Sequence, residues 1–185
     1  FGILQENAFP PGHPYSWTTI GSMEDLNAAS LDDVHSWFKQ YYGASNAVVV
    51  LAGDIDVATA KEKMQKYFGS IKSGEPIERK QVWVAKRTEQ KRIQTYDRVP
   101  QARIYKMWNT AELGRTDADH LQLVQEILGG GKNSRLYKRL VHQDQIATNV
   151  WVGYYQFELS SMFIISADAK KDASLAALET AIDEE

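Results

Sequence analysis

Histidine is the side chain most often used as a metal ligand or general base, and the sequence contains four: His13, His35, His120 and His142. No two of them lie three or four residues apart. The sequence therefore contains neither H-E-x-x-H nor the inverted H-x-x-E-H, in which two histidines on one helical face bind zinc and a glutamate serves as base. His35 and His120 are expected on helix surfaces, and His142 at the end of a helix. We predict no catalytic, metal-ligating or substrate-binding residue in this chain.

His13 and Tyr15 lie on a loop stiffened by Pro10, Pro11 and Pro14. A histidine and a tyrosine held rigidly in this way could form a binding site. They could instead anchor the loop, with the aromatic rings buried and the polar atoms hydrogen-bonded. We favour the anchor.

A second glycine-rich loop runs from Gly129 to Ser134 and superficially resembles a phosphate-binding loop. It lacks the Gly-Lys-Ser/Thr order, and it joins two predicted helices rather than a strand and a helix. We interpret it as a sharp break between helices. The absence of cysteine excludes disulfides, thiolate metal sites and cysteine nucleophiles.

Composition excludes further classes of protein. The net charge is −3, and the sequence has no clustered basic stripe of the kind that binds nucleic acid. No apolar run reaches the length of about 18 residues that crosses a membrane. The first residues, FGIL, do not form a signal peptide. The lack of cysteine is compatible with both the bacterial periplasm and the cytoplasm, and of the two we favour the periplasm.

Capping residues and apolar periodicity predict the helices. Ser30 precedes a helix whose apolar face is Val34, Trp37, Phe38 and Tyr41, and Gly43 ends it. Asp56 precedes a second helix that ends at Gly69. Three more helices are expected, over 117–128, 134–141 and 172–182. The last ends in Asp183, Glu184 and Glu185, which oppose the helix dipole, and we interpret this as a sequence that continues in a longer protein.

β-branched and aromatic runs predict strands over 47–52, 92–99, 102–108, 149–155 and 162–167. The segment 82–84 could form a short edge strand, and residues 8–22 form an extended loop. The strands at 48–52 and 163–167 are each followed by two aspartates and an alanine-rich helix. This repeated pattern is as readily explained by chance as by two copies of one α/β domain. We predict an α+β fold of two related units, each a mixed or antiparallel sheet with helices packed on one face. Their expected ranges are 1–72 and 91–185, joined by a linker over 73–90.

Four segments together resemble pitrilysin/insulinase-type zinc metallopeptidases: 9–15 (FPPGHPY), 20–22 (IGS), 41–56 (YYGASNAVVVLAGDID) and 127–141 (ILGGGKNSRLYKRLV). The resemblance covers nearly the whole chain in the family's order and spacing. It implies that 1–72 is the C-terminal half of a first peptidase-like domain and 91–185 the N-terminal part of a second. Members of the family bind zinc through H-x-x-E-H and a later glutamate, and zinc assists attack of water on a peptide carbonyl.

The same resemblance places the zinc site upstream of this chain, so zinc is expected only in the parent protein. Glu6 is too near the His13 loop to serve as the third ligand. The family also holds the substrate with an arginine and a tyrosine seven residues apart, and these positions fall here at Val141 and Thr148. Neither side chain can replace a guanidinium or a phenol.

The resemblance implies that this chain is a non-catalytic scaffold, a wall of the chamber in which a bacterial zinc endopeptidase hydrolyses peptides or small proteins. Its partners would be the remaining domains, and the chain alone should be inactive. The alternative is a non-catalytic partner subunit of a peptidase heterodimer. A stand-alone small-molecule-binding protein is the weakest of the three hypotheses, because it would require natural chain ends.

Overall fold

The computed structural model describes residues 2–185 and divides into two compact units. Unit 1 consists of Phe1–Thr18 and Gln81–Glu185, and unit 2 consists of Thr19–Lys80. The predicted α+β class is confirmed, since helices accompany an antiparallel sheet. The structure groups residues 1–18 with the C-terminal half of the chain, whereas the sequence analysis groups them with residues 19–72.

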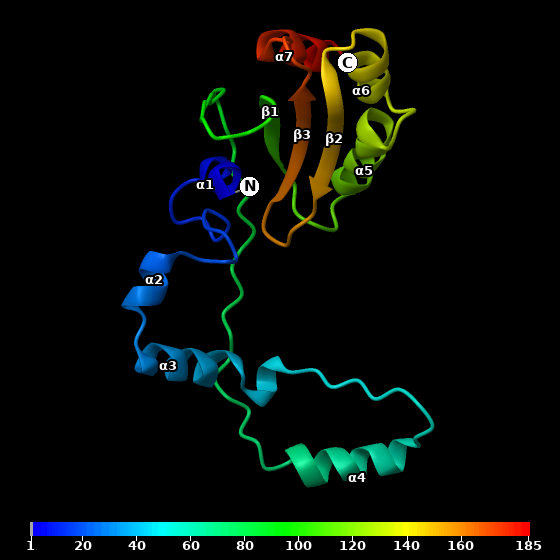
Figure 1. Ribbon diagram of the computed structural model, residues 1–185. Helices are drawn as coiled ribbons and strands as arrows, with labels where there is room; N and C mark the ends of the chain where they lie inside the picture. The colour runs from blue at the N-terminus through cyan, green and yellow to red at the C-terminus, as the bar shows by residue number, and fades with distance from the viewer. Residues whose placement is uncertain (1) are drawn as a thin grey trace. The chain divides into compact units, whose positions relative to one another are not determined.

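The sheet of unit 1 contains three strands: β1 (Arg103–Thr110), β2 (Ala147–Tyr155) and β3 (Ser161–Ala169). Their order is β1-β3-β2, and β3 pairs antiparallel with both neighbours (Figure 1). Phe163 of β3, for example, lies between Trp108 and Tyr154. These strands confirm the predictions at 102–108, 149–155 and 162–167.

Three helical segments cover one face of this sheet: α5 (Thr116–Gly129), α6 (Arg135–Tyr137), which continues as a π-helical turn (Lys138–Gln143), and α7 (Leu175–Glu184). Figure 1 shows α5 and α6 beside β2. Alternate residues of β3 point to this side and pack with the helices. The buried residues of this core are Leu136, Leu140, Ala147, Val150, Val152, Phe163, Ile165, Ala167, Ala169, Leu178, Ala181 and Ile182.

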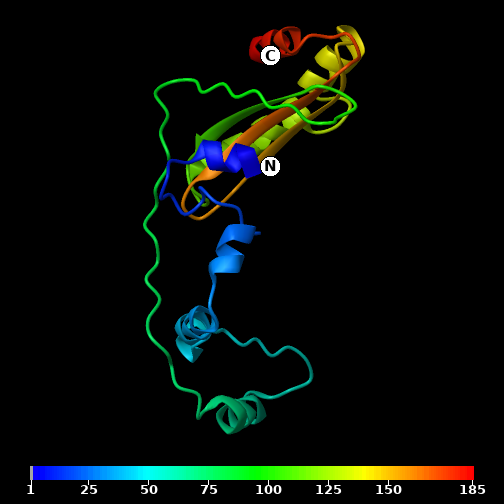
Figure 2. The same ribbon diagram turned by 60° about the vertical axis from the view of Figure 1, so that its left-hand side comes forward.

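The opposite face of the sheet is covered by α1 (Gly2–Ala8) and the loop after it (Figure 2). Ala8 and Phe9 pack there on Met162 and Ile164, together with Ala85. β3 is therefore apolar along both faces because both are covered. The short helices α1 and α2 (Met23–Ala28) have no equivalent in the sequence-based prediction.

Unit 2 contains α2, α3 (Leu31–Tyr41), a 3₁₀ turn (Ala44–Asn46) and α4 (Val57–Phe68). Ser30 caps α3 in a reciprocal box with Asp33, and the Asp56 side chain caps α4 by accepting from the Thr59 N–H at 2.9 Å. Both predicted helices are confirmed, because a cap and an apolar face depend on neighbouring residues only. No residue of Thr19–Lys80 is buried.

Two predicted strands are wrong. The backbone of Ala47, the first residue of the run 47–52, is extended (φ −119°, ψ 139°). No residue of this run pairs with a strand in the described chain. A strand is stable only when its backbone groups have a partner, and unit 2 supplies none. Residues 92–99 form no strand either: this run is largely polar, and Tyr96 is 88% exposed rather than packed on a sheet. The segment 82–84 forms no regular strand, although the Trp83 N–H donates to the Leu159 carbonyl at 3.2 Å.

Candidate functional site

The His13 imidazole is fully buried in unit 1, and both of its nitrogens have partners. Its Nδ1 accepts from the Tyr15 main-chain N–H at 3.0 Å, which leaves Nε2 as the donor to the Trp83 carbonyl at 2.7 Å. The ring stacks on Phe9, with centroids 4.5 Å apart, and lies 4.8 Å from the Trp83 ring. No lone pair remains for a metal or a substrate proton.

Tyr15 completes this arrangement by joining the loop to the end of the sheet. Its hydroxyl oxygen accepts from the Leu159 N–H at 3.2 Å, and its ring lies 5.3 Å from Phe157. The prediction of a packed anchor is confirmed. The anchor fixes the loop, and with it α1, over one face of the sheet.

The other three histidines lie at the surface, as predicted for His35 and His120, and His142 lies in the last turn of a helical segment, as predicted for it. His142 contacts the Tyr137 ring edge-on at 5.2 Å. Residues 2–185 contain no group of three or more histidine, cysteine, aspartate or glutamate side chains placed to hold a metal ion. The donors present do not fit a catalytic zinc, which needs three protein ligands around one point. Within the same residues, no helix has the length and apolarity needed to cross a membrane.

The loop 129–134 is a break between helices, as predicted. A Cβ on Gly129 would lie 2.4 Å from Val152 Cγ2 and 2.9 Å from the Val152 main-chain nitrogen. The absence of a side chain at Gly129 is therefore what allows α5 to approach β2 closely. Gly131 then adopts a φ of 95°, which favours glycine, and Ser134 precedes α6.

Val141 and Thr148, where the resemblance noted from the sequence would put the substrate-holding pair, both have structural contacts. Val141 packs against the core between the sheet and the helices. Thr148 lies where the β2–β3 register shifts, and its hydroxyl lies 2.8 Å from Gln101 Oε1. Neither side chain offers a cation or a phenol to a carbonyl.

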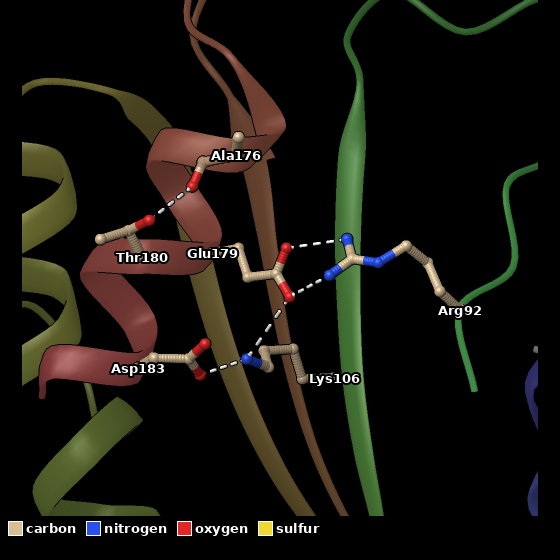
Figure 3. A network of polar contacts seen from close by, with 6 residues as sticks. All are labelled: Arg92, Lys106, Ala176, Glu179, Thr180 and Asp183. Atoms are coloured by element: carbon tan, nitrogen blue, oxygen red, sulfur yellow. Dashed lines mark hydrogen bonds and ion pairs between the residues drawn. The ribbon is translucent and has the colours of Figure 1, made fainter. Parts of the chain in front are cut away.

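Figure 3 shows an ion-pair network between residues that lie far apart in the sequence. Arg92 donates to both carboxylate oxygens of Glu179 on α7, at 2.6 and 2.8 Å. Lys106 of β1 lies 3.9 Å from Glu179 and pairs with Asp183. The hydrogen bond from Arg92 lowers the pKa of Glu179, and the carboxylate raises the pKa of Arg92. The network ties α7 to β1 and to the segment before it.

The acidic residues at and just after the C-terminal end of α7 are also paired. Arg139 donates to Glu184 at 2.8 Å and also pairs with Asp144, and Arg135 donates to Glu185 at 2.9 Å. These partners offset the unfavourable interaction between a helix C-terminus and negative charge. The acidic end of α7 thus has a structural explanation within the described residues. Because the partners are distant in sequence, only the folded chain could reveal them.

A shallow pocket of about 420 Å³ lies between the end of α1 and the segment around Trp83. Two of its basic residues bind Asn7 near the end of α1: Arg87 donates to the Asn7 main-chain carbonyl, and Lys91 donates to the side-chain oxygen Asn7 Oδ1 at 2.7 Å. Cations at a helix C-terminus satisfy its free carbonyls and its dipole. The pocket is therefore explained as part of the α1 attachment.

The sequence of this chain is similar to a known protein family and to several of its members. A family model described as the peptidase M16 inactive domain matches residues 28–185. The zinc protease PqqE of Helicobacter pylori is 26% identical over 176 residues, which are 92% of this chain and 39% of that protein. The non-peptidase homolog YmxG of the same species is 23% identical over 172 residues, which are 85% of this chain and 39% of that protein.

A solved structure, the crystal structure of a protease from Helicobacter pylori, superposes with a TM-score of 0.70 at 24% identity. The match covers 93% of this chain and 42% of that one, and it establishes a shared fold. The chain thus spans about two fifths of the length of the relatives it matches.

Proposed function

The chain belongs to the peptidase M16 family, in the part of it described as the inactive domain, and we propose that it is a non-catalytic portion of a zinc-dependent endopeptidase. In this proposal it forms part of the wall of a chamber in which peptides or small proteins are hydrolysed. The observation that carries the proposal is the match of the inactive-domain model to residues 28–185.

The chemistry of the described residues supports a scaffold role. The one buried histidine has both nitrogens hydrogen-bonded, and the acidic residues of α7 pair with arginine and lysine rather than with one another. The relative named as a zinc protease supports zinc in the parent protein. Its ligands would come from outside residues 2–185.

A second candidate is a non-catalytic partner subunit of a peptidase heterodimer. The similarity to a protein named as a non-peptidase homolog favours it, since that relative matches over a comparable share of its length. In this case zinc and the catalytic glutamate would lie on a different polypeptide.

Peptidase assays on the natural gene product that contains this chain distinguish the two. The first proposal predicts cleavage of a quenched fluorescent peptide by that product alone, inhibited by 1,10-phenanthroline and restored by zinc. The second predicts cleavage only after a zinc-binding partner is added. The 185-residue chain alone should cleave nothing, and chelator-sensitive cleavage by it would refute both. Periplasmic localisation remains part of the proposal, and fractionation of the source bacterium tests it.

A further inference from the structure

Strand β2 lies at an edge of the unit 1 sheet, and its sequence carries no protection against pairing with a further strand. β3 lies on one side of it, and no strand within residues 2–185 lies on the other. Its residues, ATNVWVGYY, include neither a charge nor a proline. Edge strands often carry such residues, because their free backbone groups otherwise pair with another chain. Any protection of β2 therefore comes from a neighbouring element.

The main-chain N–H of Tyr154 shows which backbone groups of β2 face outward. It donates to the side-chain oxygen Oε1 of Gln125 at 3.1 Å. Gln125 belongs to α5 and not to β3, so this N–H points away from β3. In an antiparallel ladder the N–H groups of successive residues point to alternate sides. The N–H groups of Val150 and Val152 therefore face the same outer edge as that of Tyr154.

Helix α5 approaches β2 closely at a second place. A Cβ on Gly129 would lie 2.9 Å from the Val152 main-chain nitrogen, so the end of the helix lies directly against Val152. Figure 1 shows α5 beside β2, on the side away from β3. Paired strands lie about 4.8 Å apart, and a strand added at Val152 would therefore meet the helix backbone.

The core holds α5 in this position. Leu121 and Leu128 pack against the buried residues between the sheet and the helices. Gln125 and Gly129 are four residues apart and share one side of the helix. Gln125 is partly buried, whereas Gln122, nearly one turn earlier, is exposed. The helix thus presents an acceptor at Tyr154 and a bare backbone at Val152 to the same strand.

We propose that α5 closes the outer edge of β2 to an extended peptide strand, with Gln125 occupying the Tyr154 N–H that such a strand would bind. An incoming peptide gains no hydrogen bond at Tyr154 until the Gln125 side chain moves away. The inference concerns the fold of unit 1 and holds whether or not the parent protein is a peptidase. In the proposed chamber wall, it means that extended substrates contact β2 without joining its sheet.

A peptide with the sequence of β2 itself is the probe, because that sequence forms a strand in this fold. It carries a lysine pair at each end for solubility and a fluorescent label, and anisotropy measures its binding to the 185-residue chain. Gln125→Ala removes the acceptor, and Gln125→Glu retains one. Gln122→Ala makes the same truncation at an exposed position of the same helix.

Gln125→Ala should bind the peptide at least about tenfold more tightly than the parent, Gln125→Glu and Gln122→Ala, because the peptide then supplies the only acceptor for a free N–H. Equal affinities of Gln125→Ala and Gln122→Ala would overturn the proposal. So would binding by the parent that is as tight as binding by Gln125→Ala.

Peptides methylated on the main-chain nitrogens of alternate residues show whether binding is strand pairing. One of the two alternating sets removes the donors that face β2, and that peptide should bind Gln125→Ala at least about tenfold more weakly than the unmethylated one. If neither set of methyl groups weakens binding, the peptide adheres to exposed apolar side chains without pairing, and the proposal is wrong.

Hydrogen exchange of the unsubstituted chain, resolved by NMR, needs no variant to fold. The Tyr154 amide should exchange at least about 100-fold more slowly than in the free peptide, because its hydrogen bond to Gln125 must open first. Exchange within about tenfold of the free peptide would show an open edge and would overturn the proposal.

Discussion

Replacement of His13 by alanine should destabilise unit 1 severely although no catalytic function is lost. The substitution removes the acceptor of the Tyr15 N–H and the donor to the Trp83 carbonyl, and the side chain that forms both hydrogen bonds is fully buried. It also removes the ring that stacks on Phe9 and makes a tilted contact with Trp83. The anchored loop and α1 would then lose their attachment to the sheet.

The size of this effect follows from the contacts. Each buried polar group left without a partner costs about 1–3 kcal/mol, and each lost aromatic contact about 0.5–1.5 kcal/mol. We expect a total loss of about 3–5 kcal/mol after partial relaxation, against a typical domain stability of about 5–15 kcal/mol. His13→Asn should lose less, because its side-chain oxygen can replace Nδ1 as the acceptor for Tyr15.

Urea denaturation followed by circular dichroism measures the effect. His120→Ala is the matched control, since His120 is exposed on α5, and it should change the free energy of unfolding by less than about 0.5 kcal/mol. If His13→Ala and His120→Ala unfold at the same urea concentration, the anchor interpretation is wrong. His13 would then have to be reconsidered as a functional side chain.

Three further predictions concern other parts of the chain. Gly129→Ala should destabilise unit 1 by about 1–3 kcal/mol in thermal melts, because the new Cβ would overlap Val152; an unchanged midpoint would show that α5 and β2 separate at no cost. The pKa of Glu179 is lowered by Arg92, so their pair stabilises the fold above the unfolded carboxyl pKa of about 4.5 and this contribution is lost as the pH falls through the folded pKa. Glu179→Gln should therefore reduce the loss of stability on acidification below about pH 4.5, and identical pH profiles would contradict this. Thr148→Ala in the longer protein should leave peptide turnover within a few fold; a drop of about 10²–10³, the cost of losing an oxyanion donor, would place substrate binding in this domain.

Features set by neighbouring residues were predictable from the sequence. Ser30 and Asp56 mark helix starts because their side chains bond to backbone groups three residues away. The anchoring role of His13 and Tyr15 was also predictable in kind, because prolines on either side stiffen the loop. The glycine-rich loop after α5 was correctly predicted as a break, although only the structure shows that Val152 requires a glycine at 129.

Features that depend on distant residues were not predictable. The run at 47–52 has the composition of a strand, but a strand also needs a neighbour, which composition does not reveal. Considered alone, the acidic residues at the end of α7 interact unfavourably with the helix dipole. The structure places Lys106, Arg135 and Arg139 beside them, and these partners are distant in sequence. The zinc site is assigned to another part of the parent protein by resemblance alone, and that assignment stays a prediction.

The zinc content of the purified 185-residue chain tests the central claim most directly. Mass spectrometry for metals, after dialysis against zinc and then against buffer alone, should find no stoichiometric zinc, because the described residues hold no cluster of suitable donors. Calorimetric titration should likewise detect no site. One zinc ion per chain, bound with micromolar or tighter affinity, would contradict the account of this chain as a non-catalytic portion of an M16 protein.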